Sequence, residues 1–310
     1  MILCCGEALI DMIPKPTEAD RDGYVPYSGG AIFNTAVGLG RLGVQAGMLS
    51  GVSNDLFGQQ LVAALTASHV DCTALIRSDR PSTLAFVQLT DGHATYTFYD
   101  ENSAGRMIAA DDLPALSDDV NALYFGGISL CAEPAAATYL ALMEREAGQR
   151  VIMIDPNIRP GFIDDIEGYR ARLDRMIALS DIVKVSDEDL NWIYPGPESL
   201  EEKLGKVRAS GPSVVVLTRG GDGSSAFLAS GEQVHAAVNK VEVVDTVGAG
   251  DTFNSGVLAR LSELGALTND GLRTAAPETI QSALEFGAKV AAVTVSRAGA
   301  NPPWRHELQG

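Results

Sequence analysis

The stretch Val-Glu-Val-Val-Asp-Thr-Val-Gly-Ala-Gly-Asp-Thr-Phe, at residues 241–253, decides the fold. Its pattern predicts a strand that ends at Asp245, a short turn, and a helix that opens around Ala249. Gly248 and Gly250 let backbone N–H groups approach a ligand closely, and the N-terminus of the helix adds partial positive charge. The segment therefore predicts an anion-binding site that needs no basic side chain.

Asp251 falls in the first turn of this predicted helix, beside the same backbone N–H groups. One interpretation is a helix-capping carboxylate, which is common near helix starts. A carboxylate next to an anion site weakens anion binding, however, so we expect it to have a chemical role. Accepting a proton from a hydroxyl group that attacks a phosphoryl group is such a role. Asp251 is thus the candidate catalytic base.

The rest of the chain alternates short apolar runs with helical patterns. Strands are predicted at residues 2–6, 45–52, 122–125, 151–154, 182–185 and 213–217, with a hairpin over 224–227 and 234–238. Helices are predicted at residues 34–42, 54–68, 135–146, 169–179, 249–264 and 277–293. Short apolar strands between helices indicate a mostly parallel sheet covered on both faces. The predicted class is therefore a doubly wound α/β fold.

Two regions near the N-terminus follow a different pattern. Residues 8–27 and 83–99 alternate apolar and polar side chains, and residues 14–27 are typical of a loop or an edge hairpin. Asp91-Gly92 is a strong hairpin signal within the second region. Alternation of this kind predicts a small separate sheet with one solvated face.

Composition excludes several classes of protein. The 310 residues allow one large α/β domain with an appendage, or two domains. A net charge of −17 disfavours binding to nucleic acid or to anionic membranes. The four cysteines show no CxxC spacing, which favours reduced thiols over a disulfide framework or a zinc site. The N-terminus lacks the pattern of a signal peptide, and no apolar run has the length of a membrane span, so we expect a cytoplasmic protein.

Residues 38–43, Gly-Leu-Gly-Arg-Leu-Gly, match the dinucleotide-binding pattern GxGxxG. That pattern must follow a strand and open a helix, whereas here it ends a helical stretch. We expect close helix packing and a helix C-cap at Gly43 instead. A Rossmann dehydrogenase is therefore disfavoured.

Residues 245–253 resemble the second signature of the PfkB, or ribokinase-like, carbohydrate kinases. Residues 29–36 are similar to the first signature, with Ile32 in place of the usual proline, and Gly6-Glu-x-Leu-Ile-Asp11 matches the family's start. The resemblance covers the whole chain. It implies one ribokinase-like α/β domain over residues 1–310, with a small β-sheet lid formed by residues 11–27 and 83–101.

The resemblance also implies roles for particular residues. Asp251 is implied as the catalytic base, with Gly248, Ala249 and Gly250 as the anion hole. Sugar binding is implied for Asp11, Gly29, Gly30, Asn34, Tyr99 and Arg159, and ATP binding for Lys184, Ser186, Thr218, Gly220 and Gly223. Without the family, Asp11 is an edge-strand charge and Asn34 a helix N-cap.

Metal sites are implied as well. Ser186 and Asp189 replace the family's usual Asn-x-x-Glu, so Asp189 is the expected indirect ligand of Mg²⁺. Asp245 resembles a monovalent-cation ligand, for K⁺, and is otherwise a strand-end cap.

The sugar is indicated by residues 155–160, Asp-Pro-Asn-Ile-Arg-Pro, which resemble fructokinases and 2-keto-3-deoxygluconate kinases. Residues 96–99 and 183–189 look most like bacterial fructokinases. The resemblance implies transfer of a phosphoryl group from ATP, with Mg²⁺, to the terminal hydroxyl of fructose. A 2-keto-3-deoxygluconate kinase or another PfkB sugar kinase is the alternative.

A non-catalytic binding protein on this fold is disfavoured by the intact Asp251 and its flanking glycines. Phe86, Phe98 and Tyr99 would be partly exposed on such a lid, and the resemblance implies either their burial against the substrate or a homodimer through the lid, of which we favour the homodimer.

Overall fold

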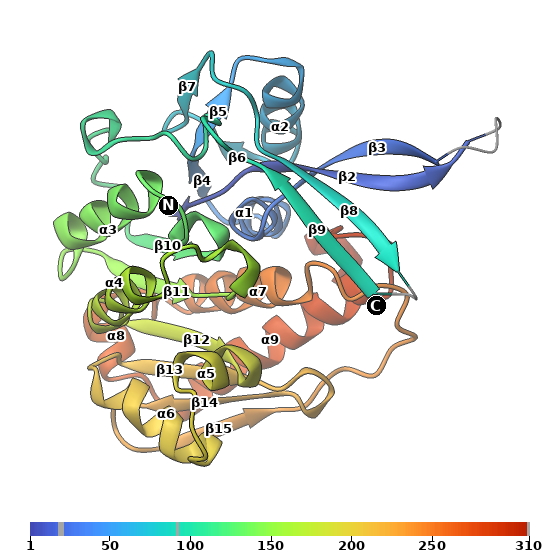
Figure 1. The fold of residues 1–310 in the computed structure, drawn as a ribbon. Coiled ribbons are helices and arrows are strands. Elements are labelled where there is room, and N and C mark those ends of the chain that lie inside the picture. The colour runs from blue at the N-terminus through green and yellow to red at the C-terminus, as the bar shows by residue number, and fades with distance from the viewer. Residues whose placement is uncertain (18–21, 91–92, 309–310) are drawn as a thin grey trace.

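The computed structural model describes residues 1–17, 22–90 and 93–308, and its centre is a nine-stranded sheet (Figure 1). The strand order is β15-β14-β13-β12-β11-β10-β1-β4-β6. The strands are β1 (Ile2–Cys5), β4 (Ala46–Leu49), β6 (Val70–Asp71), β10 (Ala122–Gly126), β11 (Val151–Asp155), β12 (Ile182–Ser186), β13 (Val214–Thr218), β14 (Ser224–Leu228) and β15 (Gln233–Ala236). All neighbours from β6 to β13 are parallel, and the last two pairs are antiparallel. The sheet is thus mostly parallel, as predicted.

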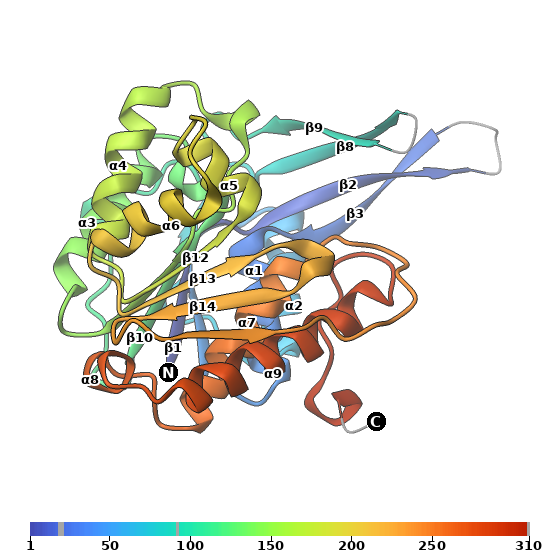
Figure 2. The same cartoon turned by 90° about the horizontal axis from the view of Figure 1, so that it is seen from below.

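Helices cover both faces of this sheet (Figure 2). One layer contains α1 (Ala31–Arg41), α2 (Leu56–Ala67), α7 (Ala249–Glu263), α8 (Asn269–Arg273) and α9 (Pro277–Val295), and the other contains α3 (Ala135–Glu146), α4 (Ile166–Ala178), α5 (Asp187–Ile193) and α6 (Leu200–Ala209). Side chains of a strand alternate between the two cores, so Cys4 packs in the first and Cys5 in the second. The doubly wound α/β prediction is confirmed. Within the described residues, no helix has the length and apolar character that crossing a bilayer requires.

Some predicted elements differ from the structure. The prediction of a strand that ends at Asp245 is wrong, because residues 237–248 form a loop. The N–H groups of Val244 and Asp245 both donate to the carbonyl of Val295, a pattern that does not occur between paired strands. Helices α5, α6 and α8 were not predicted, because they are short and rich in charged residues. The predicted strand 45–52 is divided into β4 and β5 (Gly51–Ser53).

A separate four-stranded sheet extends away from the large one (Figures 1 and 2). Its strands are β2 (Leu9–Pro16), β3 (Asp22–Gly29), β8 (Leu84–Thr90) and β9 (His93–Tyr99), in the order β3-β2-β8-β9. Strands β2 and β3 pair antiparallel, as do β8 and β9, so both regions form hairpins. The Asp91-Gly92 turn lies outside the described residues. The predicted small sheet is confirmed.

The glycines of residues 38–43 serve helix packing rather than nucleotide binding. A Cβ atom at Gly40 would lie 2.0 Å from the carbonyl oxygen of Ser68, and one at Gly38 would lie 2.3 Å from the hydroxyl oxygen of Ser255 on α7. Gly43 follows the helix with a φ of +82°, as a left-handed C-cap glycine does. The packing interpretation is confirmed.

Replacing Gly40 with alanine should lower the free energy of unfolding by about 1–3 kcal/mol, because the backbone of Ser68 must move. Urea unfolding measures the change. Gly205→Ala on α6 is the control, since its Cβ meets no atom within 4 Å. We expect the control to gain up to about 1 kcal/mol from helix propensity. Equal stability of Gly40→Ala and the wild type would contradict the packing role.

Candidate active site

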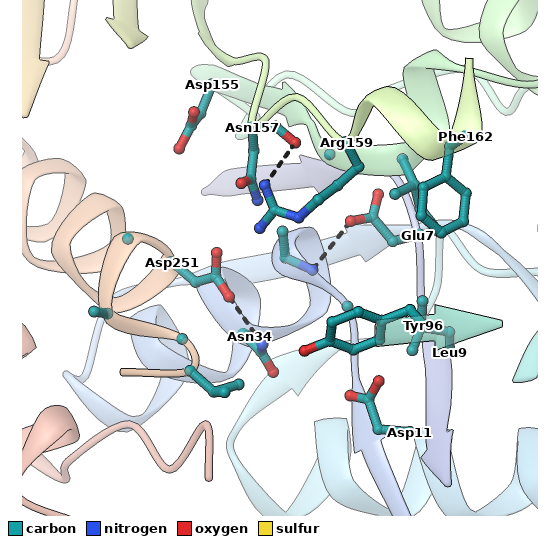
Figure 3. Close-up of a pocket in the computed structure, with 18 of the residues that line it drawn as sticks. Glu7, Leu9, Asp11, Asn34, Tyr96, Asp155, Asn157, Arg159, Phe162 and Asp251 are labelled. Atoms are coloured by element: carbon teal, nitrogen blue, oxygen red, sulfur yellow. Dashed lines mark hydrogen bonds between the residues drawn. The ribbon is translucent and has the colours of Figure 1, made fainter. Parts of the chain in front are cut away.

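A cavity of about 340 Å³ lies between the large sheet, the N-terminus of α7 and the small sheet (Figure 3). The carboxyl ends of neighbouring parallel strands supply much of its wall. Glu7 follows β1, Gly127 follows β10, Asp155 ends β11 and Lys184 lies in β12. This edge of a doubly wound sheet is where ligands bind in such folds. The cavity is therefore the candidate active site.

Asp251 lies at the inner end of this cavity and is 8% exposed. Its Oδ2 atom accepts a hydrogen bond of 2.9 Å from the side-chain amide of Asn34 on α1. The N-cap of α7 is Gly248, in the left-handed region with a φ of +78°, and α7 has no side-chain cap. The capping interpretation of Asp251 is thus wrong. Asn34 is no cap either, since α1 begins at Ala31 with Gly30 as its N-cap.

Burial and the neighbouring side chains shift the pKa of the Asp251 carboxyl group. Burial raises the pKa of Asp251 to about 7, the Asn34 hydrogen bond opposes the rise, and the carboxylates of Asp155 and Glu7 add to it. A general base works best when its pKa lies near the working pH. Asp251 therefore changes charge near neutrality, and its basic form becomes populated as the pH rises through about 7.

Lys184 places a buried cation beside the anion hole. Its ammonium lies 2.9 Å from Asp155 Oδ2, an atom that also accepts a 2.7 Å hydrogen bond from Asn254. Burial lowers the pKa of Lys184, but the carboxylates of Asp155, Asp189 and Asp251 outweigh it and raise the pKa above its ordinary value. Lys184 is thus charged, and it lines the same cavity as Gly250.

Arg159 is the second cation that lines the cavity. Its guanidinium donates to the backbone carbonyls of Asn157 and Ile158, and the structure assigns it no salt bridge within the described residues. Asn157 has a φ of +44°, a strained value that bends the chain after β11 and brings Arg159 to the wall. Figure 3 shows Arg159, Glu7 and Asp251 around the same space.

The register of the small sheet decides which of its side chains meet the cavity. Asp11 pairs with Ala85, and Ala85 pairs with Phe98, so Asp11, Phe98 and Tyr96 share one face. All three line the cavity. Burial raises the pKa of Asp11 to about 6.

Tyr99 lies on the opposite face of this sheet, against Phe86. The predicted contact of Tyr99 with a sugar does not fit this placement, because Tyr96 and Phe98 line the cavity and Tyr99 does not. The Phe98 ring also packs edge-on against Phe162, with centroids 3.9 Å apart, and so joins the small sheet to the chain after β11.

Other predicted residues lie next to the cavity rather than in its lining. Gly29 makes room for a neighbour, because a Cβ there would lie 2.1 Å from Asp11 Oδ2. Thr218, Gly220 and Gly223 lie at the end of β13 and in the turn after it. Gly223, with a φ of +86°, lets that turn approach the carbonyl of Ala236. These residues occupy the same edge of the sheet as the cavity.

Asp189 is not part of the lining of the cavity, and its indirect role near Mg²⁺ stays a prediction. Its Oδ1 accepts the N–H of Ile158, and its Oδ2 accepts both the N–H and the hydroxyl of Ser186. Ser186 in turn caps α5. The pair therefore supports the loop after β11 and the start of α5.

Asp245 ties the loop before α7 to the C-terminal segment. Its two carboxylate oxygens accept N–H groups from Val247 and Gly299, at 3.0 and 2.8 Å. Among the described residues, no cluster of three or more His, Cys, Asp or Glu side chains could hold a metal ion.

Several lining residues escaped the sequence analysis, namely Glu7, Tyr96, Phe98, Asp155 and Phe162. Glu7 and Asp155 lie in residues 6–11 and 155–160, which carry part of the family resemblance. No pattern in the sequence shows, however, that their carboxylates face the same cavity. The alternation of residues 93–99 shows that Tyr96 and Phe98 lie on one face of a strand and Tyr99 on the other, but it does not show which face meets the cavity. The pairing of β9 with β8 decides this.

Comparison with known proteins agrees with this geometry. Residues 1–307 match the pfkB family carbohydrate kinases. A fructokinase from Rhizobium leguminosarum bv. trifolii is 51% identical over 86% of this chain and 82% of that protein. A fructokinase with bound ATP from Xylella fastidiosa has a TM-score of 0.88 at 26% identity, over 99% of this chain and 97% of that one. A fructokinase from Vibrio cholerae O395, with fructose, ADP and calcium ion bound, has a TM-score of 0.83 at 27% identity, over 96% and 94%. The chain therefore belongs to the pfkB family of carbohydrate kinases.

Proposed function

We propose that this protein transfers the γ-phosphoryl group of ATP to the terminal hydroxyl of fructose, giving fructose 6-phosphate and ADP. The observation that carries the proposal is the buried Asp251 carboxylate beside the N-terminus of α7. That pair supplies a base and an anion site within one helical turn. The 51% identical relative is a fructokinase, and the neighbouring structures hold ATP in one case and fructose with ADP in another.

In the proposed reaction, Asp251 accepts the proton of the sugar hydroxyl as its oxygen attacks the γ-phosphorus. The bond from that phosphorus to the oxygen of ADP breaks, and ADP leaves with the electron pair. The N–H groups at Gly248, Ala249 and Gly250 stabilise the charge on the transferred group. Lys184 adds a buried positive charge next to them.

The sugar is held by groups that both donate and accept hydrogen bonds. We assign Asp11, Asn34 and the backbone at Gly30 to its hydroxyls, with Tyr96 and Phe98 above the ring. Residues 11–27 and 83–101 then act as a lid, which the Phe98–Phe162 contact holds against the loop after β11. Such closure excludes water from the phosphoryl group.

The nucleotide lies along the neighbouring strand ends in this proposal. Ser186, Thr218, Gly220 and Gly223 line its path from β12 and β13. The site fits Mg²⁺ carried on the phosphates, because Asp155 Oδ1 is a buried acceptor without a hydrogen-bond partner in the described structure. It can accept from a water of the ion's shell. When bound, the ion neutralises charge on the phosphates.

A monovalent cation such as K⁺ is proposed near Asp245. The Asp245 carboxylate joins the loop before α7 to residue 299, and each of its oxygens keeps a lone pair for a cation. A related Vibrio cholerae fructokinase variant was solved in a potassium-bound form. The cation would hold the loop that leads into the anion hole.

We also propose a homodimer through the lid. On the sheet face opposite the cavity, the ring of Phe86 contacts those of Tyr24 and Tyr99 edge-on. Tyr24 and Tyr99 are 42% and 57% exposed, which makes an apolar patch that a second copy would cover.

Light scattering should give twice the 32.6 kDa mass of the chain, and Tyr99→Glu should shift the protein to monomer, because a charge in the covered face is costly. Ile166→Glu on α4 is the control for an exposed apolar residue outside the lid. A wild-type monomer at micromolar concentration would contradict the dimer.

The substrate assignment is tested by ADP release with ATP, Mg²⁺ and a panel of sugars. We expect fructose to give the highest kcat/KM. If Arg159 binds a substrate carboxylate instead, 2-keto-3-deoxygluconate should have the higher kcat/KM, because its carboxylate gains a charge-assisted hydrogen bond. That outcome would change the substrate assignment but leave the kinase assignment in place. ADP release with none of the sugars would overturn the proposed function.

Asp251→Asn should lower kcat by at least about 10²-fold, because the amide keeps the shape of the side chain but cannot take the proton. ATP binding should persist or tighten, since a negative charge beside the phosphates is lost. Asp165→Asn is the control, because Asp165 caps α4 and asparagine caps about as well. Near-wild-type turnover in folded Asp251→Asn protein is the result that would remove the base assignment.

A further inference from the structure

Glu7 lies between β1 and β2 and is bound to the start of α1. Its Oε1 accepts the N–H of Ala31 at 3.0 Å, and its backbone carbonyl accepts the N–H of Phe33 at 3.3 Å. The first N–H groups of a helix have no partner within the helix. Glu7 therefore satisfies two of those N–H groups from outside α1.

This external partner replaces a cap that α1 lacks. The N-cap is Gly30, which has no side chain to accept from the helix. A carboxylate suits the position, because the positive end of the helix dipole favours negative charge. The usual local cap of Ser, Thr, Asp or Asn is thus replaced by a residue from the segment between β1 and β2.

The surrounding backbone makes room for this carboxylate. Its Oε2 accepts the N–H of Ser129 at 3.2 Å, which joins α1 to the turn after β10. A Cβ atom at Gly127, whose φ is +66°, would lie 2.1 Å from Glu7 Oε1. A Cβ at Gly30 would lie 3.0 Å from Glu7 Cγ. Both glycines line the cavity with Glu7.

The first turn of α1 carries the groups that hold the base. Asn34 donates to Asp251 Oδ2, and the hydroxyl of Thr35 donates to the backbone carbonyl of Asp251 at 3.1 Å. We propose that Glu7 is a positioning residue, which caps α1 from outside the helix and thereby orients Asn34 and Asp251. Its effect on turnover rests on the proposed function, whereas its effect on Asp251 does not.

Glu7 also acts on Asp251 through charge. The ionisable groups that face Asp251 are Glu7 after β1, Tyr124 from β10, Asp155 from β11 and Lys184 from β12. Burial is the first cause of the raised pKa of Asp251. The carboxylates of Asp155 and Glu7 raise that pKa further, and Lys184 lowers it. Burial also raises the pKa of Glu7 itself, and its hydrogen bonds from Ser129 and Ala31 oppose that rise. At a pH where Glu7 is ionised, removing its charge lowers the pKa of Asp251, an effect that a merely structural residue would not have.

The test is Glu7→Gln. The amide oxygen of glutamine can still accept the N–H of Ala31, but the NH₂ group then faces the N–H of Ser129, so that hydrogen bond is lost. The readouts are kcat and the pH midpoint at which the Asp251 carboxyl carbon titrates, followed by NMR. The signal of this carbon is identified as the one that is missing from the spectrum of Asp251→Asn. We expect the midpoint to fall by about half a pH unit from its wild-type value near 7. We expect kcat at a pH above both midpoints to fall about tenfold, because the base is misplaced.

Glu202→Gln is the matched control. Glu202 accepts the N–H of Ser199 at 2.8 Å in the capping box of α6, outside the lining of the cavity, so neither readout should change. Glu7→Asp keeps the charge and shortens the side chain, so kcat should fall while the midpoint stays. This variant also tests the proposal if Glu7→Gln fails to fold.

An unchanged midpoint or an unchanged kcat in folded Glu7→Gln overturns the proposal, as does wild-type kcat in Glu7→Asp. The midpoint is measured without turnover. A wild type that phosphorylates no sugar would therefore remove the proposed function and leave the inference about Glu7 testable.

Discussion

The hydrogen bond from Asn34 to Asp251 is the contact on which the site depends, and it joins residues 217 positions apart. Asp251 is buried, and an unpartnered carboxylate in such a place is costly. The bond fixes the first turn of α1 against the first turn of α7. Around it, the Ser255 hydroxyl lies within hydrogen-bond distance of the carbonyls of Thr35 and Asp251, and Gly38 leaves space for Ser255. Two helix starts thus meet at one carboxylate.

Charge is distributed unevenly in this cavity. Four carboxylates, those of Glu7, Asp11, Asp155 and Asp251, face two lining cations, Lys184 and Arg159. Lys184 is paired with Asp155, and Gly248, Ala249 and Gly250 at the start of α7 line the same cavity. In the proposed function this arrangement suits a chain with a net charge of −17, because a phosphate group would be bound by local groups and not through a basic surface.

The pleat of the small sheet places different side chains on its two faces. One face presents Asp11, Tyr96 and Phe98 to the cavity, and the other presents Tyr24, Phe86 and Tyr99 to solvent. A shift of the β8–β9 pairing by one residue would turn Tyr96 and Phe98 away from the cavity face and bring Tyr99 onto it. The contact of Phe98 with Phe162 links the sheet to the loop that carries Arg159.

The sequence by itself determined the doubly wound α/β class, the anion-binding turn at residues 248–250 and Asp251 as the base candidate, because each depends on local periodicity and glycine chemistry. It also located Asp11, Asn34 and Lys184 through family resemblance. Only the tertiary structure decided that Tyr96 faces the cavity in place of Tyr99, that Asp189 supports α5, and that Glu7 caps α1. Those outcomes depend on strand register and on contacts between distant segments, which local patterns do not encode.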